Sequence, residues 1–283
     1  MRRILAFIAV TLLLVPFAIA QDLQLPRVSQ NATVKQTIGL TDVTITYSRP
    51  GVKGRVIWGN LVPYDKIWRT GANEATTISV SKDVKINGQP LPAGTYSLHT
   101  IPGKTEWTLI FNKVAKQWGS FDYKQSEDAI RVKVKPESGP MQEWMQFSFP
   151  DVQPNSATAV LAWEKVRVPF TIETDTLKQA MDSIQKALSG EVKNWEVPYD
   201  AAEFVFTNKG DKAQGMKWLD QSIGLKETFW NLRLKADMLA QDGKKKEAIE
   251  TAEKAVKIGK ENKDEPSEVE KTEKQLAEWK AGN

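Results

Sequence analysis

The sequence contains no cysteine and a single histidine, His99, among its 283 residues. The missing cysteines exclude disulfides, thiol nucleophiles, zinc fingers and Cys-ligated iron–sulfur clusters, and one histidine excludes a multi-histidine metal centre. No His-Glu-x-x-His, Gly-x-Ser-x-Gly, P-loop or Gly-x-Gly-x-x-Gly pattern occurs either. We therefore expect no metal and no cofactor, and a protein without a familiar catalytic motif.

A long hydrophobic run occurs only at the N-terminus. Met1-Arg2-Arg3 is positively charged, residues 4–17 are almost wholly apolar, and Ala18-Ile19-Ala20 has the small side chains that signal peptidase requires. We expect cleavage after Ala20 and a soluble periplasmic or secreted protein with no transmembrane anchor after cleavage. The missing cysteines also exclude a lipoprotein anchor.

The positive charge is too small and too dispersed to indicate nucleic acid. The formal net charge is +4, and removal of residues 1–20 lowers it to +2 because Arg2 and Arg3 are lost. Residues 21–173 then carry 18 basic and 14 acidic side chains, and residues 174–283 carry 19 and 21. A nucleic-acid-binding surface concentrates basic residues on one face, so we expect no nucleic-acid partner.

Residues 21–173 have the pattern of an all-β domain. Apolar and polar residues alternate over 41–47, 130–134 and 145–149, and further short strands are expected around 78–80, 95–100, 107–111 and 157–163. Turn sequences such as Asn87-Gly88 and Pro154-Asn155 separate these segments. Many short strands with such turns predict an antiparallel β-sandwich, here with one long loop around 49–74.

Residues 174–283 have the spacing of helices. A first helix is expected over 174–189, capped by Thr174 or Asp175, and a last charged helix over 267–279. Between them, Gly210 and Gly243 lie 33 residues apart, and apolar or small residues match at that offset. This spacing is similar to a pair of degenerate tetratricopeptide repeats over 196–261. Such repeats either bind a partner or brace the β domain.

The long loop is the strongest candidate for a binding site, because aromatic rings stack on sugars while arginine binds carboxylates with two parallel hydrogen bonds. The candidate ligand-binding residues are Arg49, Arg55, Trp58, Tyr64, Trp68, Arg69 and Asn73. The expected partner is an envelope glycan or an acidic peptide or protein. In the alternative, the tryptophans fold into the sandwich, the arginines pair locally and the domain is purely structural.

Hydrolysis is the competing function. Glu74, Asp65 and His99 are the candidate acid and base groups of a cell-envelope hydrolase acting on glycan or peptide. This hypothesis requires at least two of them to meet in one pocket. In the structural alternative, Glu74 pairs with Arg69 or Arg55.

Several phrases of the β domain carry a family resemblance. They are Thr44–Pro50, Gly54–Gly59, Leu61–Thr76 (which includes Trp-Arg-Thr-Gly-Ala-Asn-Glu), Leu91–Leu98 and Trp107–Asn112. Over about residues 24–172 the chain resembles the secreted bacterial family called domain of unknown function 2911, common in the Bacteroidetes. The resemblance implies an exported β-rich domain without an established activity. We expect a non-enzymatic binding or scaffolding protein, with the hydrolase as the alternative.

Overall fold

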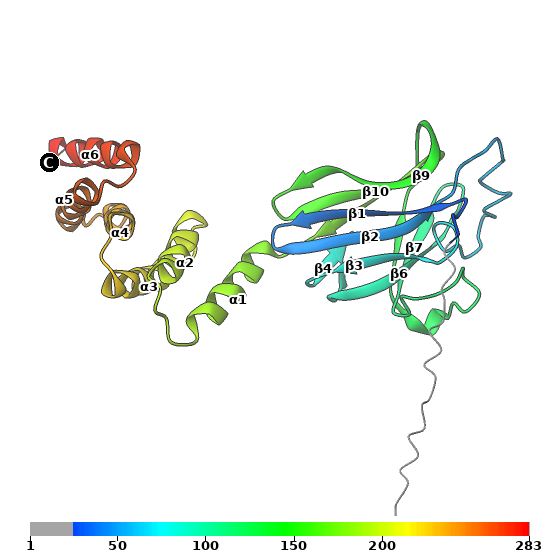
Figure 1. Ribbon diagram of the computed structural model, residues 1–283, viewed down its shortest axis with the longest axis horizontal. Helices are drawn as coiled ribbons and strands as arrows, with labels where there is room; N and C mark the ends of the chain where they lie inside the picture. Colours follow the sequence, from blue (N-terminus) through cyan, green and yellow to red (C-terminus); the bar gives the residue numbers. More distant parts are fainter. Residues whose placement is uncertain (1–24, 283) are drawn as a thin grey trace, which may run out of the picture. The chain divides into compact units, whose positions relative to one another are not determined.

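The computed structural model describes residues 25–282, which divide after Thr174 into two compact units. Figure 1 shows a β unit followed by a helical unit. The expected signal peptide, residues 1–20, lies outside the described residues. Among the described residues, no helix is long and apolar enough to cross a bilayer.

The β unit is a sandwich of two antiparallel sheets, as the alternating sequence pattern predicts. The six-stranded sheet contains, in spatial order, β1 (Gln30–Ile38), β2 (Thr41–Arg49), β3 (Thr76–Val80), β6 (Gly94–Ile101), β7 (Trp107–Asn112) and β8 (Asp128–Val134). The four-stranded sheet contains β5 (Gln89–Leu91), β4 (Val84–Ile86), β10 (Ser156–Glu173) and β9 (Glu137–Gln153).

Strand β2 illustrates how the pattern builds the core. Val43 and Ile45 are fully buried between the sheets, whereas Thr46 on the opposite face is exposed. Successive side chains of a strand point to opposite faces, so this alternation leaves one apolar face and one polar face. The outer face of this part of the sheet is consequently rich in threonine.

Two strands are joined by a turn that the sequence already indicates. The loop Asn87-Gly88 joins β4 and β5, and both residues have positive φ, 45° and 81°. A two-residue hairpin requires this left-handed backbone at both positions, and Asn-Gly is the pair that adopts it most readily. Strand β1 is not among the expected strands, because it lies at a sheet edge and has only a short apolar stripe.

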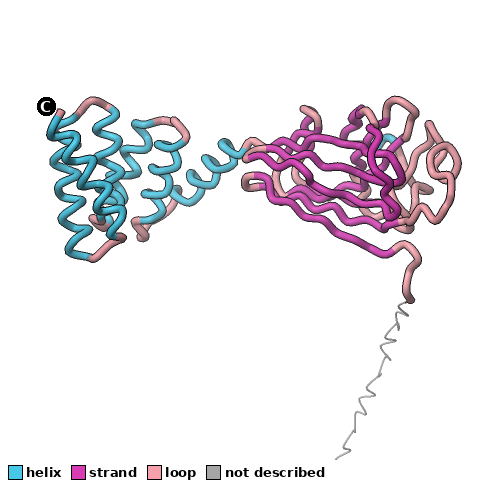
Figure 2. Tube along the Cα trace, turned by 90° about the horizontal axis from the view of Figure 1, so that it is seen from above, coloured by secondary structure: helices cyan, strands magenta, loops and turns pink. Residues whose placement is uncertain are grey.

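The helical unit contains six helices. They are α1 (Thr176–Leu188), α2 (Glu196–Thr207), α3 (Lys212–Leu225), α4 (Phe229–Gln241), α5 (Lys245–Asn262) and α6 (Pro266–Ala281). The Asp175 side chain accepts a hydrogen bond from the Lys178 backbone N–H, so Asp175 is the N-cap of α1. Figure 2 shows α2–α6 as adjacent helices joined by short loops.

The helix starts repeat with the period expected from the sequence. α2 begins at Glu196 and α4 at Phe229, 33 residues later. α3 and α5, which begin at Lys212 and Lys245, have the same offset. The helices pack as the pairs α2–α3 and α4–α5. This part of the chain is therefore a tandem of two helical hairpins, followed by α6.

Candidate functional site

The long loop between β2 and β3, residues 50–75, closes one end of the sandwich. Its start pairs with β9, where the Pro50 carbonyl accepts the Met145 N–H at 3.0 Å. Its middle pairs with β6, where Trp68 and Thr100 exchange two backbone hydrogen bonds of 2.8 Å. The loop is thus tied to both sheets by backbone bonds. In Figure 1 it forms the light-blue connection at the right-hand end of the β unit.

Two tryptophans of this loop belong to an aromatic cluster in the core. Trp58 and Trp68 pack against Trp107 of β7 and Trp163 of β10, with ring centroids 5.0–6.4 Å apart. Trp68 stacks on Trp163 at an angle of 19°, whereas the other pairs meet edge to face. Such contacts stabilise a core beyond the burial of area alone. The alternative expectation, that the loop tryptophans fold into the sandwich, therefore holds for these two side chains.

Among the described residues, the arginine at the end of β2 and those of the loop, in contrast, form no internal salt bridges. Arg49 donates from Nε to the Met145 carbonyl at 2.9 Å. Arg55 donates to the carbonyls of Gly51 and Val52. Within residues 25–282, no carboxylate pairs with either residue or with Arg69.

A basic pocket lies beside the tryptophan cluster. Its volume is about 390 Å³, and its lining comprises Val28, Ser29, Pro50, Gly51, Lys53, Arg55, Leu61, Val62, Trp68, Arg69, Gly71, Ala72 and Trp163. The charged residues of this lining are all basic. Glu143 of β9 lies nearby, and its carboxylate accepts a hydrogen bond from the backbone N–H of Lys53.

Two buried N–H donors in this lining have no acceptor. They are Nε of Arg69 and Nε1 of Trp163, and neither has a hydrogen-bond partner among the described residues. Burial lowers the pKa of Arg69, but a guanidinium remains charged at any physiological pH. A half-buried cation and an indole N–H without acceptors are costly for the fold. Both residues belong to the lining of the basic pocket.

The other predicted ligand residues have structural partners. Tyr64 covers Gly59, where the φ of 86° favours glycine and a Cβ would lie 2.9 Å from the Tyr64 ring. Asn73 also has positive φ, 58°, and its amide donates to the Ser29 carbonyl and to Ser48 Oγ. The predicted set therefore separates: Arg55, Trp68 and Arg69 line the basic pocket, and the rest of the set does not.

The three candidate acid–base residues have separate surroundings. Both oxygens of Glu74 accept hydrogen bonds of 2.7 Å from Arg27, so the expected pairing with Arg69 or Arg55 is wrong. This pair lowers the pKa of Glu74. Asp65 is exposed, and its backbone N–H bonds the Pro102 carbonyl. No hydrogen bond or ion pair among the described residues links any two of the three.

His99 lies beneath the loop of residues 113–127, which covers the outer face of β6 and β7. Its Nδ1 lies 3.2 Å from Ser120 Oγ, its ring packs on Tyr123, and its buried Nε2 has no partner within residues 25–282. Burial lowers the pKa of His99 to about 4, despite the nearby carboxylate of Asp128. The imidazole is therefore neutral at pH 7 and closed off from solvent.

Sequence reasoning missed Trp163 and did not place Lys53 among the ligand residues. Trp163 is on β10, almost a hundred residues beyond Arg69, and it reads as an ordinary core position. Lys53 carried a usable signal, because it lies in the same basic and aromatic loop.

Comparison with known proteins adds one finding about the β unit. No curated protein and no solved structure matches the chain. A family model described as a protein of unknown function, DUF2911, matches residues 29–172. This range contains both sheets and nearly the whole lining of the basic pocket. The chain therefore belongs to the DUF2911 family.

Proposed function

We propose that the protein binds a carboxylate-bearing ligand in the basic pocket and acts by binding rather than by catalysis. The observation that carries this proposal is the pair of unsatisfied buried donors, Arg69 Nε and Trp163 Nε1, in a lining whose charges are all basic. A carboxylate has two acceptor oxygens in one plane, which match the fork of a guanidinium. Lys53 and Arg55 supply further positive charge at the same pocket.

The proposal places the protein in the cell envelope. The sequence of residues 1–20 supports export, because a basic start, an apolar run and Ala18-Ile19-Ala20 form a signal peptide pattern. Envelope glycans and acidic peptides both carry carboxylates, so both are suitable sources of the ligand. A mass spectrum of the protein from the envelope fraction, with Gln21 as its first residue, would support this location.

The test is a thermal-shift series with defined probes: glucuronate, a glutamate-rich peptide and inorganic phosphate. A ligand that binds only the folded state raises Tm, and the rise grows with the logarithm of the ligand concentration relative to Kd. We expect glucuronate or the peptide to raise the Tm of the wild type, and Arg69→Gln to abolish the shift. Lys85→Gln removes one positive charge from an exposed position on β4 and should leave the shift intact. A shift with phosphate alone, or equal shifts in all three proteins, would contradict the proposal.

We also infer that α2–α5 form two degenerate tetratricopeptide-like repeats that offer a second binding surface. The 33-residue offset of the helix starts supports this inference, as does a groove of about 220 Å³ between α2 and α4. Tyr199, Phe206, Trp230 and Arg233 contribute to its lining. Aromatic and charged groups in such a groove suit a peptide. Loss of peptide-array binding in Trp230→Ala, with retained helicity, would support this role.

A further inference from the structure

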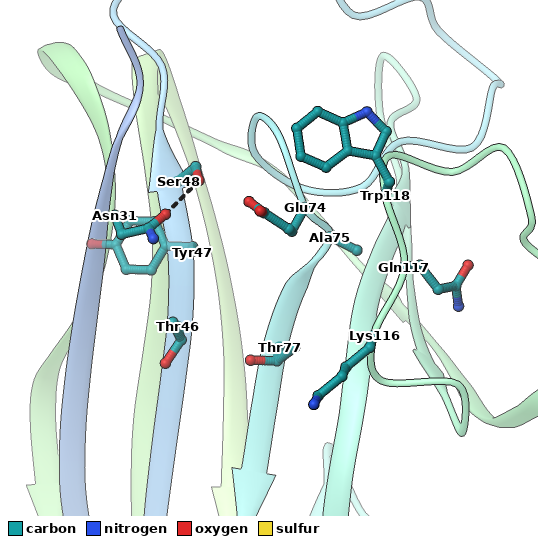
Figure 3. Close-up of a pocket in the computed structure, with 10 residues that line it drawn as sticks. All are labelled: Asn31, Thr46, Tyr47, Ser48, Glu74, Ala75, Thr77, Lys116, Gln117 and Trp118. Carbon is teal, nitrogen blue, oxygen red and sulfur yellow. Dashed lines mark hydrogen bonds between the residues drawn. The ribbon is translucent and has the colours of Figure 1, made fainter. Parts of the chain in front are cut away.

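A second pocket lies on the outer face of the six-stranded sheet, and Glu74 is the one predicted site residue in its lining. Its volume is about 520 Å³. Figure 3 shows the lining: Asn31, Thr46, Tyr47, Ser48, Glu74, Ala75, Thr77, Lys116, Gln117 and Trp118. Trp118 lies at one end of this group, across the pocket from Asn31 and Ser48. We call it the Trp118 pocket.

Trp118 differs from the tryptophans of the core because 56% of its surface is exposed. Its backbone is nevertheless held firmly. The N–H of Ala75 donates to the Gln117 carbonyl at 2.9 Å, and the N–H of Gly119 donates to the Asn73 carbonyl at 3.1 Å. The exposed indole is a flat apolar surface. Because its backbone is fixed, the side chain loses little conformational entropy when a ligand stacks on this surface.

Polar groups surround the Trp118 ring. Glu74, which pairs with Arg27, presents a carboxylate. The Arg27 guanidinium lies over one face of the Trp118 ring, 5.9 Å from its centroid. The amide nitrogen of Asn31, the hydroxyl of Thr77 and the ammonium of Lys116 have no hydrogen-bond partner in the described part of the chain. Figure 3 shows the Lys116 side chain extending toward Thr77. The pocket thus joins an apolar surface to several hydrogen-bonding groups at its edges.

This combination matches a sugar ring. A pyranose has an apolar face of C–H groups that stacks on an indole, and hydroxyls around its rim that require donors and acceptors. Ligand pockets generally combine an apolar lining with a few placed polar groups, and tryptophan suits a site that is apolar at one end and wet at the other. A peptide strand would instead need the free edge of a sheet, whereas this pocket lies on a sheet face.

The two pockets are neighbours, because the same two segments line both. Ser29 lines the basic pocket, and Asn31 lines the Trp118 pocket. In the second segment, Ala72 lines the basic pocket and Glu74 lines the Trp118 pocket. Asn73 lies between them and bonds Ser29 and Ser48, which ties the two segments together. The two pockets therefore lie on either side of Asn73.

We infer that the ligand is an acidic oligosaccharide, with one uronate in the basic pocket and an adjacent sugar stacked on Trp118. This inference rests on the proposed function for the uronate and adds the class of ligand. Trp118 and the groups beside it form the subsite for the second sugar. Binding therefore strengthens when the ligand grows from one sugar to several, and the added affinity depends on Trp118.

Calorimetric titration tests this inference with glucuronate, a linear uronate tetrasaccharide and a glutamate-rich peptide. The proteins are the wild type, Trp118→Ala, Trp118→Phe and Arg69→Gln, each checked for folding by circular dichroism. We expect the tetrasaccharide to bind the wild type about tenfold more tightly than glucuronate, which is near the upper end of what one stacking contact provides. Trp118→Ala should remove this gain without changing glucuronate binding, and Trp118→Phe should retain part of it.

The outcomes separate the two proposals. Equal affinity for both saccharides, lost in Arg69→Gln and unchanged in Trp118→Ala, would overturn the saccharide subsite and leave the basic pocket intact. A Trp118-dependent gain with the peptide but not with the saccharide would also overturn it. If Arg69→Gln bound every probe as tightly as the wild type does, the proposed function itself would be overturned.

Discussion

The residues of the candidate site fall into two groups: those whose contacts stabilise the fold and those that are available to bind a ligand. Trp58 and Trp68 pack in the core, and Asn73 fixes the backbone where the two pockets meet. Arg69 does neither, because it is half-buried without an acceptor within the described residues. A side chain that costs stability is characteristic of a functional position, where binding compensates for the cost.

Replacement of Arg69 by methionine should therefore stabilise the ligand-free protein. Methionine has a similar length and carries no charge, so it removes the unpaired half-buried cation without leaving a cavity. We expect the free energy of unfolding to rise by about 0.5–1 kcal/mol, as is common when functional strain is relieved. Urea denaturation of the β unit, with Lys85→Met as the surface control, provides the measurement. A clear loss of stability would show that Arg69 has a structural role.

His99 should make the β unit sensitive to acid. Its pKa is about 4 in the folded protein and near 6.5 in the unfolded chain. Between these values the unfolded state binds a proton that the folded state does not, so stability falls as pH falls from 6.5 to 4. Integration over this range gives a loss of about 3 kcal/mol from this residue. Denaturation at a series of pH values should show this loss, and His99→Gln should reduce it.

At the scale of elements, regular strands could be predicted and long-range partners could not. The alternation in β2 and the Asn87-Gly88 turn are local signals, so the sequence contains them. The pairing of Arg27 with Glu74 joins residues 47 positions apart, and no local pattern records it. Trp118 lies in a loop without periodicity, and it meets residues 73–75 only through the fold. The sequence therefore indicates the loop that lines the basic pocket, but not the residues from other strands that complete the lining.

The helical unit depends on one buried polar residue at the start of α4. Asn231 and Thr228 form a capping box, and the Asn231 amide also donates to Ser222 Oγ and to the Lys226 carbonyl. Asn231 is fully buried, so its loss leaves several buried groups without partners. We expect Asn231→Ala to lower the free energy of unfolding by about 2–3 kcal/mol.

The loss of helical signal on heating measures this effect. Asn208→Ala is the matched control, because the Asn208 amide bonds only the Phe204 carbonyl among residues 25–282 and the residue is exposed. This control should change stability by less than about 0.5 kcal/mol. Equal effects of the two substitutions would show that the buried network of Asn231 contributes little.

The whole molecule joins a β unit of the DUF2911 family to a unit of six helices. Its overall charge gives no indication of a ligand, because basic and acidic residues nearly balance over the chain. The relevant charge is local: Lys53, Arg55 and Arg69 in one pocket at the end of the sandwich. Binding at such a pocket should weaken with salt, but only modestly for Arg69 because buried charges are screened less than exposed ones.

The most direct test of this account is the dissociation constant of a uronate for the wild type and for Arg69→Met, measured by calorimetry at low and moderate salt. The account predicts that Arg69→Met weakens binding by at least about tenfold at both salt concentrations, since a hydrogen bond to a charged group contributes about 1.5–3 kcal/mol. Affinity that is equal in the two proteins, or a difference that disappears with salt, would contradict a buried carboxylate site at Arg69.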